Sequence, residues 1–323
     1  MKDIAASVKI LAVGFLTGLM ISCSGSKPAV SAAVVEPARN AFHLEAGFWN
    51  QWGDGLAEVS SYELTYPRYG KLRNGVAVTV FVSESFSYES RVKADAGNHA
   101  PADVFPVMKL NVIEDFQTGI YDYNEQTSAF LALDAVGKQA AGVLTKVSFS
   151  SQEWCGHSWM QWLRTPAGLA FSGHSYFDGE ADRAMTLSAP EAGVAEEQLP
   201  FWARGMAEPK LYPGEFRTVR LLPSLQNQRH SHRNPEWTDA KLTRDAKVVD
   251  GVETWRVEIP GGATTTYSVE QAAPRKILQW QSSTGESAKL IKSVRLKYWE
   301  LNRPGGESEL QKLGLSKRPA KTT

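Results

Sequence analysis

The chain has 323 residues, and its 35 Lys and Arg balance 35 Asp and Glu, so the formal net charge is zero. Hydrophobic residues make up 42% of the sequence, which supplies enough apolar surface to offset backbone ordering and excludes an intrinsically disordered chain. The balanced charge argues against nucleic acid as a partner, because nucleic-acid-binding proteins carry a clustered excess of Lys and Arg.

The first 22 residues have the pattern of an export signal. A weakly cationic start that contains Lys2 and Lys9 leads into an apolar run from Ile10 to Ile21. A helix that spans a bilayer needs about 20 residues, whereas the core of a signal peptide takes about 7–15. The run therefore predicts a cleaved signal rather than a permanent membrane span.

The signal ends at residues 20–23 in Met-Ile-Ser-Cys, which resembles the lipobox of bacterial lipoproteins, with Met20 where Leu is usual. The resemblance implies cleavage before Cys23 and acylation of its thiol and new amino group. Ser24, in place of Asp, implies an outer-membrane lipoprotein that faces the periplasm or the surface. Several acyl chains hold a protein stably at a membrane, and residues 23–36 would form the lipidated Cys and a flexible tether. The alternative is an ordinary secretory signal with a chance Cys.

Strand patterns dominate residues 37–188, the predicted N-terminal β-rich half, after a helix expected from about Pro37 to Asn50. Between residues 56 and 84, apolar and polar residues alternate with the period of a half-buried strand, and Asn74-Gly75 favours a hairpin turn. This segment therefore predicts a β-hairpin. Further strands are predicted at residues 105–113, 117–133, 143–149, 155–164, 169–177 and 184–188.

The pattern changes over residues 189–210, where prolines and glutamates predict a linker with a short, broken helix. Strand alternation resumes in the C-terminal β-rich half, residues 211–302, and residues 303–323 lack an apolar stripe and predict a disordered tail. With few helices to cover it, the apolar face of a long sheet must curl on itself or pack on a second sheet. The expected fold is mainly β, with curved antiparallel sheets or open, barrel-like β halves and one or two short helices.

The densest group of reactive residue types surrounds Cys155, which is the only Cys other than Cys23. If residues 165–168 form a loop, Arg164 faces Leu169 across a hairpin. His157 and His174 then lie two residues apart on one face, which Cys155 shares.

Three interpretations of this group stay open. Cys155 and His157 would form a nucleophilic pair in which imidazole generates thiolate. Cys155, His157 and His174 would bind zinc. The nearby tryptophans favour the third interpretation, a packed core strand with hydrogen-bonded histidines. His230 and His232 lie in a polar run, for which a solvated loop is expected rather than a metal site.

We expect no cofactor, because the sequence contains no P-loop, dinucleotide fingerprint, Gly-x-Ser-x-Gly elbow or His-Glu-x-x-His motif. The aromatic residues suggest a different role, since inside a curved sheet they would line a groove for an apolar ligand. The alternative is ordinary core filling. The predicted groove residues are Tyr62, Tyr66, Trp159, Trp162, Trp255 and Trp280.

Several strings between about residues 46 and 180 resemble a family of uncharacterised bacterial envelope lipoproteins, some of which carry the label "septum formation inhibitor". They include Ala57-Glu58-Val59-Ser60-Ser61-Tyr62-Glu63-Leu64, Phe116-Gln117-Thr118-Gly119-Ile120-Tyr121 and Ser150-Ser151-Gln152-Glu153-Trp154-Cys155-Gly156-His157. The early Ser-x-Ser-Pro-Arg motif of the nucleotide pyrophosphatases with that name is absent. The resemblance therefore implies location and fold, and it transfers no catalytic residue.

The leading hypothesis is an exported β-protein, attached to the membrane through its N-terminal lipid, that binds an apolar or envelope-derived ligand or serves envelope maintenance. One alternative is a structural or partner-binding envelope component without a small ligand. The other is a hydrolase or metal-dependent enzyme that uses Cys155, His157 and His174.

Overall fold

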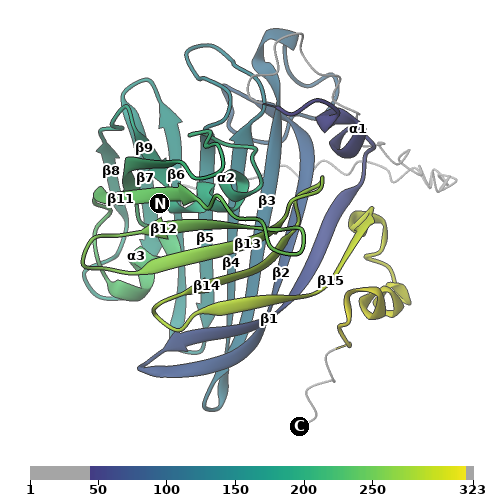
Figure 1. The fold of residues 1–323 in the computed structure, drawn as a ribbon. Coiled ribbons are helices and arrows are strands. Elements are labelled where there is room, and N and C mark those ends of the chain that lie inside the picture. Colours follow the sequence, from purple (N-terminus) through teal and green to yellow (C-terminus); the bar gives the residue numbers. More distant parts are fainter. Residues whose placement is uncertain (1–43, 318–323) are drawn as a thin grey trace, which may run out of the picture. The chain divides into compact units, whose positions relative to one another are not determined.

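The fold is built on one continuous sheet. The computed structural model describes residues 44–317, so the predicted signal, Cys23 and the tether lie outside the described residues (Figure 1). Within the described range, 15 strands follow the order β8-β7-β6-β5-β4-β3-β2-β1-β15-β14-β13-β12-β11-β10-β9. Neighbouring strands are antiparallel except β9 and β10, which are parallel. The mainly β class predicted from the sequence is confirmed.

The two predicted halves share this sheet, because β1 pairs with β2 on one side and with β15 on the other. The strands of the first half are β1 (Ala57–Arg68), β2 (Lys71–Ser87), β3 (Val104–Thr118), β4 (Tyr121–Ala132), β5 (Leu144–Glu153), β6 (Gly156–Thr165), β7 (Gly168–Ser175) and β8 (Arg183–Leu187). The later strands are β9 (Gly193–Ala195), β10 (Phe216–Leu222), β11 (Thr238–Arg244), β12 (Val252–Glu258), β13 (Thr264–Glu270), β14 (Ile277–Ser282) and β15 (Ser287–Leu296).

Helices are short. They are α1 (Phe48–Trp52), η1 (Pro101–Asp103), η2 (Glu196–Gln198), α2 (Leu199–Ala203), α3 (Leu225–Ser231), η3 (Tyr298–Glu300) and η4 (Gly306–Leu313). Residues 37–43 of the helix predicted over residues 37–50 lie outside the described range. In the rest of that range, residues 44–47 are not helical and α1 begins at Phe48. Gly47, in a left-handed conformation at φ 82°, directly precedes α1.

The first hairpin forms where it was predicted, but its turn does not. The turn is Tyr69-Gly70, and Asn74 and Gly75 lie inside β2, paired with Thr65 and Leu64. The next turn is also displaced, because Gln117, predicted to open a strand, lies near the end of β3. The turn predicted at Asn74-Gly75 was wrong because Gly75 allows β2 and β3 to pack closely and does not form a turn. A Cβ at Gly75 would lie 2.2 Å from the carbonyl oxygen of Asp115 on β3.

We expect Gly75→Ala to destabilise the protein by about 1–3 kcal/mol, because the added methyl group overpacks the β2–β3 contact. Urea unfolding measures the loss. The neighbouring exposed Asn74→Ala is the matched control and should change stability by less than about 0.5 kcal/mol. Equal stability of the two variants would contradict the close approach of β2 and β3 at this position.

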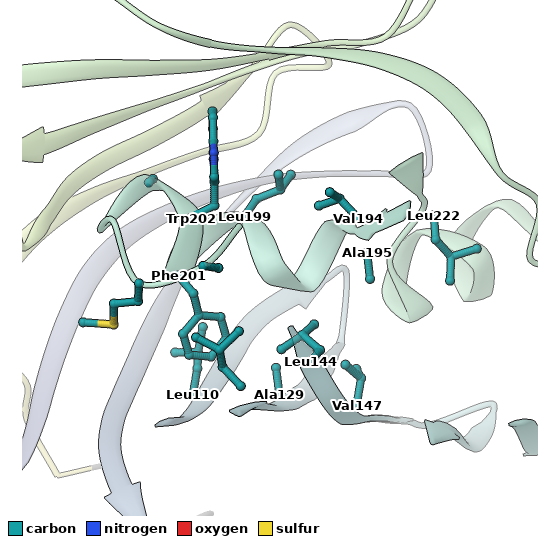
Figure 2. Packing of buried hydrophobic residues seen from close by; sticks show 14 of the residues in the cluster. Leu110, Ala129, Leu144, Val147, Val194, Ala195, Leu199, Phe201, Trp202 and Leu222 are labelled. Carbon is teal, nitrogen blue, oxygen red and sulfur yellow. The ribbon is translucent and has the colours of Figure 1, made fainter. Parts of the chain in front are cut away.

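A segment that was predicted as a linker forms part of the core. Residues 193–203 carry β9, η2 and α2, and Leu199, Phe201 and Trp202 are each at most 1% exposed. Figure 2 shows this segment above β3, β4 and β5, with Phe201 beside Leu110. Its prolines and glutamates suggested an exposed connection, but its apolar side chains cover the inner face of the sheet.

The predicted C-terminal tail is also partly ordered. Residues 306–313 form η4, which contacts β15 and β1, and Leu313 is buried among Ala57, Val59 and Val80. The hydroxyl of Ser61 donates a hydrogen bond of 2.5 Å to the carbonyl of Leu313. The prediction of disorder was wrong for η4, because a few apolar side chains here cover the outer face of the central strands.

Candidate functional site

The hairpin around Cys155 has the predicted register but the opposite exposure. Arg164 pairs with Leu169 and Trp159 pairs with His174, as expected. Ser158, Met160 and Trp162 point to the buried face, so Cys155, His157 and His174 lie on the exposed face. The packed-core interpretation was wrong because it assigned the histidines to the wrong face of a strand whose side chains alternate.

The geometry around Cys155, His157 and His174 does not favour a nucleophilic or a metal site. Cys155 lies in the turn between β5 and β6, where a hydrogen bond with Glu153 raises the pKa of its thiol and disfavours thiolate. His174 Nδ1 lies 2.7 Å from Asp182 Oδ1, and its ring stacks on Trp159. Among residues 44–317, no three His, Cys, Asp or Glu side chains are grouped to hold a metal ion.

The six predicted groove residues separate into three places. Tyr66 and Trp280 line a cavity. Tyr62, Trp162 and Trp255 are buried in the core, where the Tyr62 hydroxyl donates to the carbonyl of Ile277. Trp159 lies on the exposed face of β6.

The cavity has a volume of about 290 Å³, at the small end of the range for ligand sites. Its wall combines β1 to β4 with β13, β14, α3 and the internal η2–α2 segment. The sheet therefore curves so that strands from the start and the end of the chain face one shared space. In Figure 1, β11 to β14 cross the long strands β2 to β5.

One part of the cavity wall is apolar and the other is acidic. Phe81, Leu110, Val112, Ala129 and Ile277 supply the apolar part. The acidic part consists of four glutamates from three parts of the chain, Glu114, the consecutive pair Glu196 and Glu197, and Glu286. An amphipathic small molecule fits such a wall better than a purely apolar one.

A chain of hydrogen bonds runs from the cavity into the sheet. The Tyr66 hydroxyl lies 2.8 Å from His230 Nδ1, and His230 Nε2 lies 2.8 Å from Glu125 Oε1. Burial alone would raise the pKa of Glu125, but hydrogen bonds from His230, Gln226 and Ser151 lower it below the usual value. An ionised carboxylate only accepts, so His230 Nε2–H donates to Glu125. Both ring nitrogens of His230 are thus occupied.

Two of the cavity glutamates also hold α3 in place. Glu196 Oε2 accepts a 2.7 Å hydrogen bond from the backbone N–H of Ser224, and Glu197 Oε1 accepts one of 2.7 Å from that of Leu225. Ser224 is the N-cap of α3, and its hydroxyl accepts from the N–H of Asn227. This arrangement fixes Gln226 and His230, one helical turn apart, on the cavity side of α3.

Burial of these carboxyls raises their pKa values. Desolvation raises the pKa of Glu114 to about 8 and that of Glu197 to about 8. It also raises the pKa of Glu286 to about 7 and raises that of Glu196. Raised carboxyl pKa values at a cavity wall are typical of functional sites.

Most residues of this site were not predicted from the sequence. His230 was assigned to a solvated loop, and the four glutamates were not singled out. Pro223-Ser224 before Gln226 and His230 is a helix N-terminus signal that would have placed these two side chains on one face. Nothing in the sequence brings Glu114, Glu197 and Glu286 together, because only the curvature of the sheet does so.

We expect the wild-type protein to lose stability as the pH rises from about 5 to about 8, in part because Glu197 ionises. The folded state holds a proton on this buried carboxyl that the unfolded state releases above its usual pKa, so raising the pH favours unfolding. The free energy of unfolding of Glu197→Gln minus that of wild type should therefore be larger at pH 9 than at pH 5. We expect this increase to exceed about 1.4 kcal/mol, the free energy that corresponds to one pKa unit. Urea unfolding at both pH values measures this gain. The exposed Glu63→Gln should show no such gain, and a pH-independent difference at Glu197 would contradict the argument.

Within the described part of the chain, no helix has both the length and the apolar character that crossing a bilayer requires.

No protein-family model matches the sequence, and no curated protein does. A solved structure, that of a beta-barrel-like protein of domain of unknown function DUF1849 from Brucella abortus, is similar with 11% identity and a TM-score of 0.41. The similarity covers 75% of this chain and 98% of that one.

Proposed function

We propose that the protein binds a small amphipathic molecule in the cavity that its curved sheet lines. The single observation that carries the proposal is the cavity itself, whose wall combines apolar side chains with a set of carboxyl groups. An apolar wall with a few convergent polar groups is the usual composition of a ligand site. Tyr66 and Trp280, two of the residues expected to line a groove, contribute aromatic rings to this wall.

We also propose that the protein acts in the cell envelope, anchored by lipid at Cys23. The support is the lipobox-like sequence that ends at this residue and the short apolar run before it. Labelling cells with a clickable palmitate analogue tests the anchor. Label on the wild type and none on Cys23→Ala supports it, and equal or absent label on both overturns it.

The ligand site is tested with N-phenyl-1-naphthylamine, a neutral probe that fluoresces in apolar surroundings. We expect saturable binding to the wild type and its loss in Thr127→Trp, because Thr127 lines the cavity and an indole would fill it. The matched control is Gln126→Trp, which places the same ring on the exposed neighbouring position of β4. Equal binding by both variants, with both folded by circular dichroism, would overturn the proposed site.

A further inference from the structure

The carboxyl groups on the cavity wall have no cationic partner in the protein. Of the described residues that line the cavity, none is Lys or Arg, and His230 is the only base. His230 cannot neutralise the four glutamates, because its two ring nitrogens already face Tyr66 and Glu125. A buried carboxylate without a cation is costly unless it is protonated or a positive group arrives from outside.

The hydrogen-bond donors that reach these glutamates are neutral. Gln226 Nε2 lies 2.5 Å from Glu114 Oε2, and Trp280 Nε1 lies 2.8 Å from Glu286 Oε1. The N–H of Leu225 bonds to Glu197 Oε1. Each donor satisfies part of a carboxyl group's hydrogen-bonding capacity, and none of them supplies a positive charge.

Glu197 adds a second observation at this wall. Its side chain is buried, with a residue exposure of 7%, and it lines the cavity. Its Oε2 atom has no hydrogen-bond partner in the described structure, while Oε1 is held by α3. Buried polar atoms are nearly always paired, so the Glu197 carboxyl group keeps part of its hydrogen-bonding capacity unused beside the cavity that the residue lines.

The rest of the wall favours an organic cation over a metal ion. The rings of Tyr66, Tyr267 and Trp280 line the same cavity, and aromatic faces attract ammonium groups. The described residues contain no group of three ligating side chains close enough to share a metal ion. The apolar part of the wall would hold a hydrocarbon portion of the same molecule.

We infer that the ligand of this cavity is an amphipathic amine or quaternary ammonium compound, with its cationic group among Glu114, Glu197 and Glu286. This inference rests on the proposed function and specifies the class of ligand. The hydrocarbon part lies against Phe81 and Leu110.

Binding of such a cation should release protons near neutral pH. Burial keeps Glu114 and Glu197 protonated up to pKa values of about 8, and a cation beside them favours the ionised form. Affinity therefore rises as the pH increases from about 5 to about 8. The titratable groups that face the site from the surrounding elements are Tyr66 on β1, Glu114 on β3, Glu125 on β4, Glu196 and Glu197 on η2, His230 on α3, Tyr267 on β13 and Glu286 before β15.

Competition against N-phenyl-1-naphthylamine tests the inference with three compounds of equal chain length, octyltrimethylammonium, octyl sulfate and octyl glucoside, each below its micelle concentration. We expect the ammonium compound to displace the probe from wild type at a concentration at least about tenfold lower than the other two, since one desolvated cationic contact is worth at least this much. Glu197→Gln and, as a second variant, Glu286→Gln should reduce this preference, whereas Glu63→Gln should keep it. Calorimetry of the ammonium compound in two buffers at pH 7 should detect proton release.

The outcomes separate the two proposals. If Thr127→Trp binds the probe as well as Gln126→Trp does, the proposed cavity function fails whatever the head group. If the probe does bind in a Thr127-dependent way and octyl glucoside or octyl sulfate competes as well as the ammonium compound, the cationic ligand alone is overturned. Unchanged preference in both folded Glu→Gln variants would also overturn it.

Discussion

Phe201→Ala should destabilise the protein by about 3–5 kcal/mol, the usual cost of truncating a fully buried Phe. Phe201 has no exposed surface, and its ring meets Phe81 edge-on with the centroids 5.6 Å apart. Figure 2 places it against Leu110, beneath the backbone of α2. The residue therefore joins the internal segment to the inner face of β2 and β3.

The expected loss is large because the surroundings cannot collapse into the space. The segment that carries Phe201 is fixed on both sides by other buried residues, among them Leu199 and Trp202. The Trp202 indole N–H donates 2.9 Å to the carbonyl of Pro209, and its ring meets Trp255 edge-on. A rigid surround retains the cavity, and the cost rises with the volume that remains.

Urea unfolding of Phe201→Ala measures the effect, with Phe216→Ala as the matched control. Phe216 is 62% exposed on β10, so the same truncation there should cost less than about 1 kcal/mol. Similar losses from both variants would mean that residues 199–203 do not form part of the core. They would then be the linker that the sequence suggested.

Local patterns predicted the parts of the fold that depend on neighbouring strands. The period-2 alternation in residues 76–82 predicted β2, and the loop at residues 165–168 predicted the pairing of Trp159 with His174. Such patterns record which residues alternate, but they do not say which face is buried. For that reason the interpretation of Cys155 and His157 as part of a packed core strand was wrong.

Features that depend on distant contacts could not be predicted. Residues 199–203 are too short to show helical periodicity, and their burial depends on the curvature of the sheet. The acidic wall has the same origin, since Glu114, Glu197 and Glu286 line one cavity only in the folded sheet, in which β1 pairs with β15. A single glutamate in a sequence is most often exposed, so its burial is visible only in three dimensions.

The buried ion pair between Arg204 and Glu58 leads to the second large effect. Arg204 Nη1 and Nη2 donate to the two carboxylate oxygens of Glu58 at 2.7 and 3.1 Å, and Nη2 also donates to the carbonyl of Pro274. The guanidinium lies 4.3 Å from the ring centroid of Phe81. Both residues are at most 3% exposed, so the pair connects the end of α2 to β1 in a site shielded from water.

Arg204→Met should destabilise the protein by about 3–5 kcal/mol, because it leaves the Glu58 carboxylate buried and unpaired. Glu58→Gln alone should also be costly, since it leaves the guanidinium without its counterion. The double variant Arg204→Met/Glu58→Gln should recover a large part of the loss, because neither charge then remains buried. A double-mutant cycle in urea measures the coupling. Strictly additive losses would contradict a direct pair, whereas a double variant more stable than Arg204→Met would show that the unpaired carboxylate, rather than lost packing, causes most of the cost.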